Sequence, residues 1–292
     1  MEESIMEKYR YDGSEILNLD QVKTCECFSE DMKKIIREKT RNNQKVIRKL
    51  QDKFYADGRE SVIIVLQAMD AAGKDGTVKH VMGGVNPQGI DVYSFKQPNK
   101  EELSHDFLWR IHKCVPEYGK MGIFNRSYYE DVLVVKVHEL NKIHKMAERC
   151  MNDDDIFKKR YEDISHFEKY MYNNSYRIIK IFLNISKQEQ KNRLLQRIDK
   201  TEKNWKFSDS DMKERKLWNN YQRAYEDAIN NTSSKNSPWY VLPADQKWYS
   251  WFLVSEIVKK TLKDINPKYP KVSPENKANL KKYKEILTDE DN

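Results

Sequence analysis

Short apolar runs and longer amphipathic stretches alternate along most of the chain. The run Ser61–Gln67 is largely β-branched and apolar, which is typical of a strand buried on both faces of a parallel sheet. Similar short runs occupy residues 91–96, 121–125, 177–184 and 239–242. Apolar residues recur at helical spacing over about 30–55, 74–83, 103–115, 128–138, 154–173, 187–198, 209–230 and 247–264. This alternation predicts an α/β fold whose parallel sheet is covered by helices on both faces.

The two ends of the chain differ from this pattern. Residues 1–30 show no clear period. The tail from Pro267 is rich in lysine, interrupted by proline and poor in large apolar residues, so we expect a loosely held extension. Because Glu2, Glu3 and Glu7 stand where a signal peptide needs basic and then apolar residues, we expect a cytoplasmic protein.

Composition adds four expectations about environment and partners. Charged residues make up 34% and hydrophobic residues 38% of 292, which suits a soluble globular protein. The longest apolar run, Val62–Leu66, is too short to span a bilayer, so no membrane contact is expected. The four cysteines show no C-x-x-C pairing and are expected to be reduced thiols. The net charge of +7 points to an anionic partner if the basic residues are concentrated.

The segment Ala68–Thr77 follows the first predicted strand and opens a predicted helix. This is the setting of a phosphate-binding loop, in which backbone N–H groups point at phosphate oxygens and a lysine adds positive charge. Gly73 and Lys74 fit the motif G-x-x-x-x-G-K-[ST], whereas Ala68 replaces its first glycine and Asp75 replaces its hydroxyl. An ordinary strand–loop–helix connection with a turn of small residues is the alternative.

An aspartate inside this loop, Asp70, is its most informative departure from the motif. A carboxylate beside a phosphate site is repelled by the phosphate unless a divalent cation lies between them. Asp70 is therefore predicted to be a metal ligand.

A second block, Met121–Asp131, is another apolar strand that ends in polar residues. Ligands of open α/β sheets bind beyond the carboxyl ends of the strands, so Asn125 and Arg126 should emerge near the loop. Arg126 would neutralise charge on a transferred phosphoryl group, and Glu130 or Asp131 could bind the metal. Alternatively, Ser127 and Glu130 form a capping box at a helix start.

Together these blocks resemble the family-2 polyphosphate kinases. The family carries a loop of the type D-x-x-G-K-[GD]-G-T and a block [DN]-R-S-x-Y, matched here by Asp70–Thr77 and Asn125–Tyr129. Residues 197–211 resemble the family's lid, and residues 238–245 resemble its last strand. The resemblance covers roughly residues 40–265. Glu130 and Asp131 after the tyrosines resemble the family's third class, which phosphorylates nucleoside mono- and diphosphates, and the departures at Ala68 and Asn125 are associated with that class.

The resemblance implies a thymidylate-kinase-like, three-layer α/β P-loop kinase fold. We expect an N-terminal helical extension over 1–57, a kinase domain over 58–266 with a helical lid at about 197–215, and a tail over 267–292. The implied activity transfers the terminal phosphate of inorganic polyphosphate to AMP or ADP, with Mg²⁺ or Mn²⁺. A homo-oligomer, dimer or tetramer, is also expected.

Each candidate site residue is assigned at least one of four roles. Asp70, Lys74 and Arg126 are the expected catalytic residues. Asn125 and Glu130 are expected to bind nucleotide, and Asp70, Glu130 and Asp131 to bind metal. The expected phosphate and polyphosphate contacts are Ala71, Ala72, Gly73, Asp75, Gly76, Thr77, Lys79, Arg193, Arg197 and Lys206.

The distribution of basic residues suits a polyanion. Ten Lys or Arg lie between Lys187 and Lys216, where a closing lid could cover phosphates. A solvated helix face with pairs such as Glu189–Arg193 is the plainer interpretation. The loop is followed by further candidates for a basic groove, Lys79, Lys96, Lys100, Arg110 and Lys113.

Two other functions compete with polyphosphate-dependent transfer. A conventional ATP-dependent nucleotide kinase is disfavoured by Asp70 and Asp75, because the usual hydroxyl ligand of Mg²⁺ is missing from its place. A nucleic-acid-binding module would need aromatic residues interleaved with basic ones, and Trp205 is the one clear instance, so no nucleic-acid partner is expected.

Overall fold

The computed structural model describes residues 2–142, 146–151 and 155–290. The strands are β1 (Arg10–Tyr11), β2 (Ser61–Gln67), β3 (Ile90–Ser94), β4 (Met121–Asn125), β5 (Tyr176–Asn184) and β6 (Trp239–Pro243). The α-helices are α1 (Glu2–Glu7), α2 (Glu30–Asp57), α3 (Lys74–Val81), α4 (Trp109–His112), α5 (Val134–Val137), α6 (Glu148–Met151), α7 (Ile156–Asn173), α8 (Lys187–Asp199), α9 (Thr201–Asn204), α10 (Asp209–Lys216), α11 (Trp218–Thr232), α12 (Lys247–Ile265) and α13 (Pro274–Asp289). The 3-10 segments are η1 (Leu19–Gln21), η2 (Pro87–Gly89), η3 (Glu102–Ser104), η4 (Tyr128–Asp131) and η5 (Leu140–Lys142).

The strands form one sheet in the order β1-β6-β5-β2-β4-β3. All neighbours are parallel except β1, which pairs antiparallel with β6 at the edge. Every residue of β2 is buried, as expected for a central parallel strand. Leu66 lies opposite Asn125 of β4, so the loops that follow β2 and β4 leave the sheet side by side.

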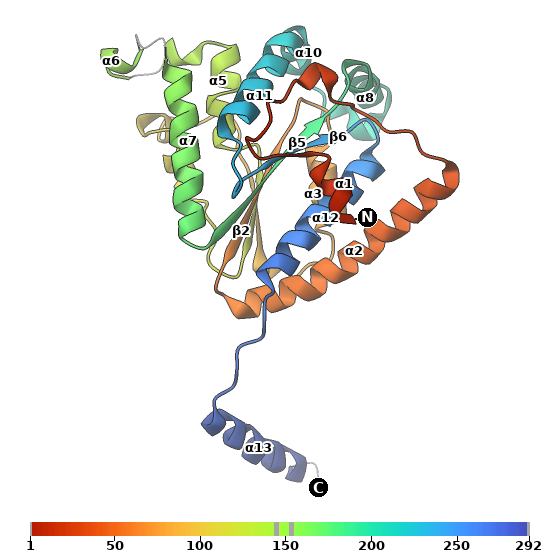
Figure 1. Cartoon of the computed structure of the whole chain (residues 1–292), viewed down its shortest axis with the longest axis vertical. Coiled ribbons are helices and arrows are strands. Elements are labelled where there is room, and N and C mark those ends of the chain that lie inside the picture. Colours follow the sequence, from red (N-terminus) through yellow and green to blue (C-terminus); the bar gives the residue numbers. More distant parts are fainter. Residues whose placement is uncertain (1, 143–145, 152–154, 291–292) are drawn as a thin grey trace.

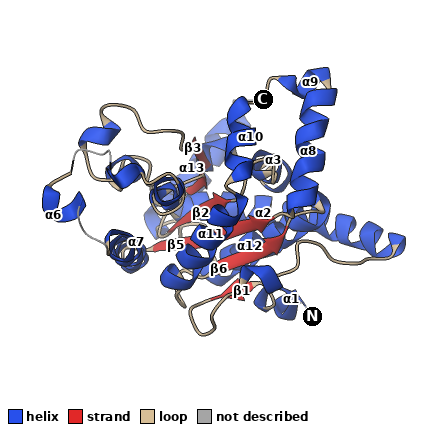
Figure 2. Ribbon diagram, turned by 90° about the horizontal axis from the view of Figure 1, so that it is seen from above, coloured by secondary structure: helices blue, strands red, loops and turns tan. Residues whose placement is uncertain are grey.

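Helices cover both faces of this sheet (Figures 1 and 2). On one side α12 packs against α3 and against the long helix α2, and on the other α7 packs against β5 and α11. Ile47 and Phe54 of α2 are fully buried in the core. The result is a three-layer α/β fold with a mostly parallel central sheet. None of the helices in the described ranges is long and apolar enough to cross a membrane.

Most predicted strands and helices are confirmed, but the helix predicted over 209–230 is divided into α10 and α11, and two other predicted helices are much shorter. In place of a helix over 103–115 the chain forms η3 and then α4. Local side-chain contacts compete with the helix there, because Asp106 accepts a hydrogen bond from the Leu108 N–H. The helix predicted over 128–138 is split into η4 and α5. The adjacent residues Tyr128 and Tyr129 are both fully buried, and both of their hydroxyls donate to Glu168 of α7, so tertiary contacts hold this turn.

The two ends of the chain also hold elements that the sequence pattern did not predict. The two-residue strand β1 extends the sheet from within residues 1–30. The tail contains α13, which begins with Ser273 as N-cap and Pro274 in its first turn. Its residues up to Glu290 are exposed, and Figure 1 shows it away from the body of the molecule.

Candidate active site

The loop between β2 and α3 has the backbone geometry of a tight phosphate-binding turn. Ala71 has φ +62° and Gly73 has φ +110°, so both lie in the left-handed region. Only glycine adopts the conformation of Gly73 without strain, because it has no Cβ. Gly73 directly precedes α3 as its N-cap, and no side chain caps this end of the helix. The first N–H groups of α3 are therefore directed toward the loop, as anion binding requires.

Lys74 lies inside the loop. Its Nζ donates a hydrogen bond to the Ala68 carbonyl at 2.8 Å. Burial, reinforced by the nearby Arg126 guanidinium, lowers the pKa of Lys74 to about 8, against the opposing effect of Asp70 and Glu130. An anion placed in the loop would favour the charged ammonium.

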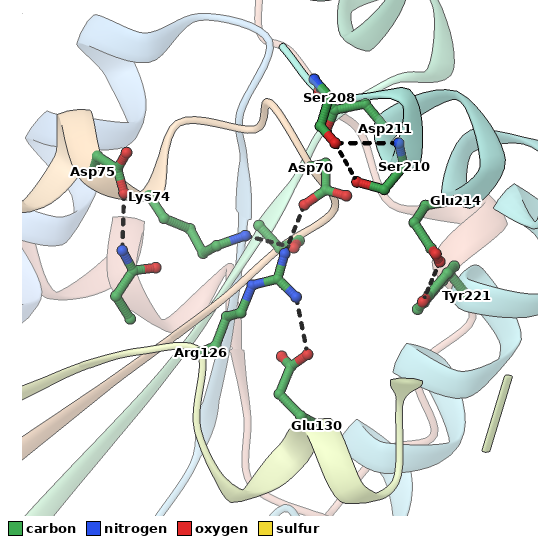
Figure 3. A network of polar contacts seen from close by, with 12 residues as sticks. Asp70, Lys74, Asp75, Arg126, Glu130, Ser208, Ser210, Asp211, Glu214 and Tyr221 are labelled. Carbon is green, nitrogen blue, oxygen red and sulfur yellow. Dashed lines mark hydrogen bonds and ion pairs between the residues drawn. The ribbon is translucent and has the colours of Figure 1, made fainter. Parts of the chain in front are cut away.

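Arg126, in the block Met121–Asp131, contacts the loop Ala68–Thr77 (Figure 3). Its guanidinium donates to Asp70 Oδ1 at 2.8 Å and to Glu130 Oε2 at 3.1 Å. These carboxylates raise the pKa of Arg126 above its usual value, with Glu130 the larger influence. Arg126 has φ +63°, an uncommon conformation for a residue with a side chain, and its N–H is held by the Leu66 carbonyl. The backbone is thus shaped to place this guanidinium beside the loop.

Arg126, Asp70 and Glu130 together form the centre of the candidate site. The other loop residues lie at different positions around this centre. Asp75 is exposed on the first turn of α3 and accepts a hydrogen bond from Asn125 Nδ2 at 2.8 Å. Thr77 is buried, and its hydroxyl donates to the Gly73 carbonyl. Gly76 lies between them in the sequence, and a Cβ added there would make ordinary van der Waals contact with Trp251. Lys79 is exposed one turn further along α3.

The capping interpretation of the second block holds only in part. Ser127 Oγ accepts a hydrogen bond from the Tyr129 N–H, as a cap should. The Glu130 carboxylate, however, contacts Arg126 instead of completing a capping box. Asp131 lies apart from this centre, with a carboxylate oxygen 3.9 Å from the Arg160 guanidinium. Burial raises the pKa of Asp131 to about 6.

The predicted lid residues separate into two groups. Arg197 donates to Asp211 Oδ2 at 3.0 Å, which ties α8 to α10, and Lys206 Nζ lies 3.8 Å from Asp75 Oδ2. Both therefore lie on the loop's side of the lid. Arg193, in contrast, is buried behind the loop.

All five N–H groups of Arg193 have acceptors. The acceptors are the carbonyls of Ala71, Ala72, Ala244 and Asp245 and the carboxylate of Glu189. This conformation leaves no donor of Arg193 for a phosphate. Arg193 fixes the loop backbone against the end of β6, and the plainer interpretation, the Glu189–Arg193 pair, is present as well.

The structure also brings in residues that were not predicted. Lys247 begins α12, and its Cε lies near Gly73. Burial, together with Arg193 and Lys203, lowers its pKa. Lys247 follows the carboxyl end of a predicted parallel strand, so the rule that located Arg126 could have found it.

Two tyrosines and an aspartate complete the surroundings of the centre. Tyr221 and Tyr225 of α11 lie close enough to Asp70 and Glu130 for these carboxylates to raise their pKa values, although burial is the larger cause. Asp211 of the predicted lid also lies near Asp70 (Figure 3). Burial and the negative charge of Asp70 raise the pKa of Asp211. No spacing in the sequence links these residues to the loop.

A cleft of about 1120 Å³ opens beside Arg126 and Glu130. Two buried arginines, Arg110 and Arg160, line it, and their guanidinium groups lie over the rings of Phe95 and Phe107 respectively. Of the predicted groove residues, Lys96 and Arg110 line this cleft. A concave site with aromatic walls and buried cations has the composition of a site for an anionic aromatic ligand.

The centre suits a divalent cation of the Mg²⁺ type. Within the described ranges no three His, Cys, Asp or Glu side chains come together as a ligand set. Mg²⁺ needs only one or two carboxylates, with water and substrate phosphates supplying the other ligands. Asp70 and Glu130 lie on either side of Arg126, which contacts one oxygen of each.

A family model and two relatives with known names connect this chain with polyphosphate kinases. The family model described as Polyphosphate kinase 2 matches residues 30–270. An ADP-polyphosphate phosphotransferase of Rhodopseudomonas palustris is 45% identical over 242 residues, which is 82% of this chain and 83% of that protein. An AMP/ADP-polyphosphate phosphotransferase of Meiothermus ruber is 47% identical over 224 residues, which is 77% of this chain and 80% of that protein.

A solved structure extends the similarity to the whole fold. The crystal structure of polyphosphate kinase 2 from Arthrobacter aurescens superposes with a TM-score of 0.83 at 36% identity and covers 94% of this chain and 96% of that one. The family model spans most of the chain, including the loop, the Arg126 block and the lid. The chain therefore belongs to the polyphosphate kinase 2 family.

Proposed function

We propose that this enzyme transfers the terminal phosphoryl group of inorganic polyphosphate to AMP and ADP, producing ADP and ATP. The observation that carries the proposal is the position of Arg126. Its guanidinium touches Asp70 of the loop on one side and lines the cleft beside Glu130 on the other. The names of the relatives from R. palustris and M. ruber support the same donor and acceptors. Activity on both mono- and diphosphates would place the chain in the family's third class.

The two sides of Arg126 suit different substrates. On the loop side lie the cations Lys74, Arg197, Lys206 and Lys247, which suit a chain of phosphates. On the other side the cleft offers aromatic rings and buried arginines, which suits the base and phosphate of a nucleotide. We therefore place the polyphosphate over the loop and the nucleotide in the cleft, with Asn125 and Glu130 at their boundary.

Transfer between these positions needs charge stabilisation more than covalent chemistry. The transferred group passes between two anionic oxygens, and its equatorial oxygens carry the charge. Lys74 would hold the donor phosphates, and Arg126 would contact the phosphoryl group during transfer. A lid that brings Arg197 and Lys206 over the loop would exclude water and limit hydrolysis of polyphosphate.

Mg²⁺ is part of this proposal, with Mn²⁺ as a substitute. Asp70 and Glu130 are the residues that would hold it, and the bound ion would neutralise phosphate charge. Asp131 is further from the centre, and its contact with Arg160 makes it a less direct ligand. Residence in the cytoplasm and a dimeric or tetrameric assembly remain predictions; light scattering of the purified protein measures the assembly.

A direct assay tests the proposal and its competitor together. The purified protein is incubated with Mg²⁺ and AMP or ADP, using polyphosphate in one series and ATP or GTP in another, and the nucleotides are resolved by chromatography. Formation of ADP and ATP with polyphosphate is expected. Conversion only with a nucleoside triphosphate would support the ATP-dependent kinase instead, which none of the relatives reported above is named as.

A further inference from the structure

A fully buried polar cluster lies beneath the Arg126 block. Glu168 of α7 is its centre, and only 1% of its side chain is exposed. Its Oε1 accepts hydrogen bonds from the hydroxyls of Tyr128 and Tyr129, both at 2.8 Å. Its Oε2 accepts from Lys180 Nζ at 2.7 Å and from the Ser237 hydroxyl at 2.8 Å. Four donors from three different parts of the chain thus converge on one carboxylate.

The rest of the cluster fixes this carboxylate from the opposite side. Lys180 of β5 is fully buried and also donates to the Thr232 carbonyl at 2.6 Å. The Thr232 hydroxyl accepts from Trp239 Nε1 at 3.0 Å and lies 2.9 Å from the Tyr129 hydroxyl. The two strands β5 and β6 and the end of α11 therefore hold Glu168 in place.

Stability alone is a weak explanation for such an arrangement. Burying an ion pair costs desolvation, and well-packed apolar residues of similar size often stabilise a protein as much or more. What distinguishes Glu168 is the pair of residues that it holds. Tyr128 and Tyr129 lie in the sequence between Arg126 and Glu130, which are joined by an ion pair beside the loop.

The same helix holds this segment at a second point. Arg160 of α7 donates to the Asp131 carbonyl at 2.8 Å. The segment from Tyr128 to Asp131 is therefore attached to α7 at both of its ends. Because Arg126 has a left-handed backbone conformation, it needs such support from its surroundings.

We infer that Glu168 is a positioning residue, which acts through Tyr128 and Tyr129 to hold the Arg126 guanidinium at the transfer site. The inference rests on the proposed function, because its effect is measured on phosphoryl transfer. Within the described part of the chain, the hydrogen-bond partners of Glu168 are Tyr128, Tyr129, Lys180 and Ser237, and of these the two tyrosines connect it to the Arg126 segment.

The test removes the two hydroxyls and keeps the rings, using Tyr128→Phe/Tyr129→Phe. Misplacement of a catalytic group by about 1 Å costs on the order of 10²-fold in rate, so we expect kcat to fall about ten- to a hundredfold. KM for AMP and for polyphosphate should change by less than about twofold, since the binding contacts remain. If the double variant does not fold, the single variant Tyr128→Phe serves the same test, because Tyr129 still holds Glu168.

A matched control separates positioning from lost stability. Tyr9 and Tyr249 form another buried hydroxyl pair, 3.2 Å apart and outside the transfer site. Tyr9→Phe/Tyr249→Phe should lower the melting temperature to a similar extent and leave kcat unchanged. An equal loss of kcat in both double variants would overturn the inference.

A double-mutant cycle tests whether the effect passes through Arg126. In an Arg126→Ala background the tyrosine substitutions should change kcat by less than about twofold, because the group they position is gone. The same loss of kcat in both backgrounds would contradict the inference, as would normal kcat in Tyr128→Phe/Tyr129→Phe. An inactive wild-type enzyme would instead refute the proposed function.

Discussion

At the scale of single residues, Arg126 is the point where the candidate site is assembled. The sequence predicted its position, because a polar residue after a buried parallel strand emerges beside the phosphate loop. It could not predict that Arg126 bridges Asp70 and Glu130, since that depends on side-chain directions. Nor could it show that all five N–H groups of Arg193 donate to the loop backbone, to the carbonyls that follow β6 and to Glu189. Sequence spacing placed Arg126 beside the loop, whereas the prediction that Arg193 contacts phosphate does not agree with its contacts in the structure.

Removal of the Arg126 guanidinium is predicted to abolish most of the catalysis. An arginine that stabilises charge during phosphoryl transfer is worth ~10³–10⁵ in rate, so Arg126→Ala should lower kcat by about that factor. Steady-state kinetics with polyphosphate and ADP measure the loss. Arg126→Lys keeps the charge without the paired donors and should retain an intermediate rate. A folded Arg126→Ala protein with near-normal kcat would rule out the role.

The pKa of Lys74 predicts a pH dependence. Because the pKa is lowered to about 8, the free enzyme holds the charged ammonium below that pH and loses it above. The value of kcat/KM for polyphosphate should therefore be constant below pH 8 and decline as pH rises beyond it. Lys74→Arg stays charged and should remove the decline, at a lower overall rate. A flat profile up to pH 10 in the wild-type enzyme would contradict this assignment.

At the scale of elements, the predicted strands and long helices correspond to those of the structure. Strands such as β2 and β4 are recognisable because a strand buried on both faces is apolar throughout. Short elements were missed where tertiary contacts override local pattern. Tyr128 and Tyr129 form η4 because Glu168 binds both hydroxyls, and β1 exists only because β6 offers an edge.

The phosphate loop depends on one glycine, and this can be tested by stability. Gly73→Ala forces a side chain into a left-handed conformation, which should lower the free energy of unfolding by about 1–2 kcal/mol. Gly76→Ala is the matched control, because Gly76 lies within α3 and its added Cβ would meet only ordinary contact with Trp251. The control should be neutral or stabilising. Chemical denaturation measures both, and equal destabilisation would show that the conformation of Gly73 is not the cause.

At the scale of the whole molecule, the site lies where the layers of the fold meet. The loop after β2, the block after β4 and the start of α12 after β6 all lie at the carboxyl edge of the sheet, and α8 and α10 contain most of the segment predicted to be the lid. In Figure 1 the lid helices lie at the same end of the molecule. The parallel order of the strands was predictable from the alternation of elements. The cleft that contains Arg110 and Arg160 was not, because the residues that line it come from separate segments.

The tail beyond the kinase fold should be dispensable for transfer. Residues of α13 are exposed throughout the described part of the tail, and the family match ends at residue 270. A chain that ends at Val272 should therefore keep its kcat and its melting temperature. Chromatography of the nucleotide products measures the first, and thermal denaturation measures the second. The truncation keeps the Lys268 N–H, which donates to Asp57. A large loss of either quantity would show that α13 contacts the catalytic body.

In the proposed reaction, polyphosphate is the donor of the phosphoryl group that Arg126 stabilises during transfer. The most direct measurement supplies ³²P-labelled polyphosphate with unlabelled AMP and Mg²⁺, and follows the label through the nucleotide products. We predict label in the β-phosphate of ADP and then in the γ-phosphate of ATP, with almost none released as orthophosphate. Label that appears only as orthophosphate, or stays in the polyphosphate, would contradict the account.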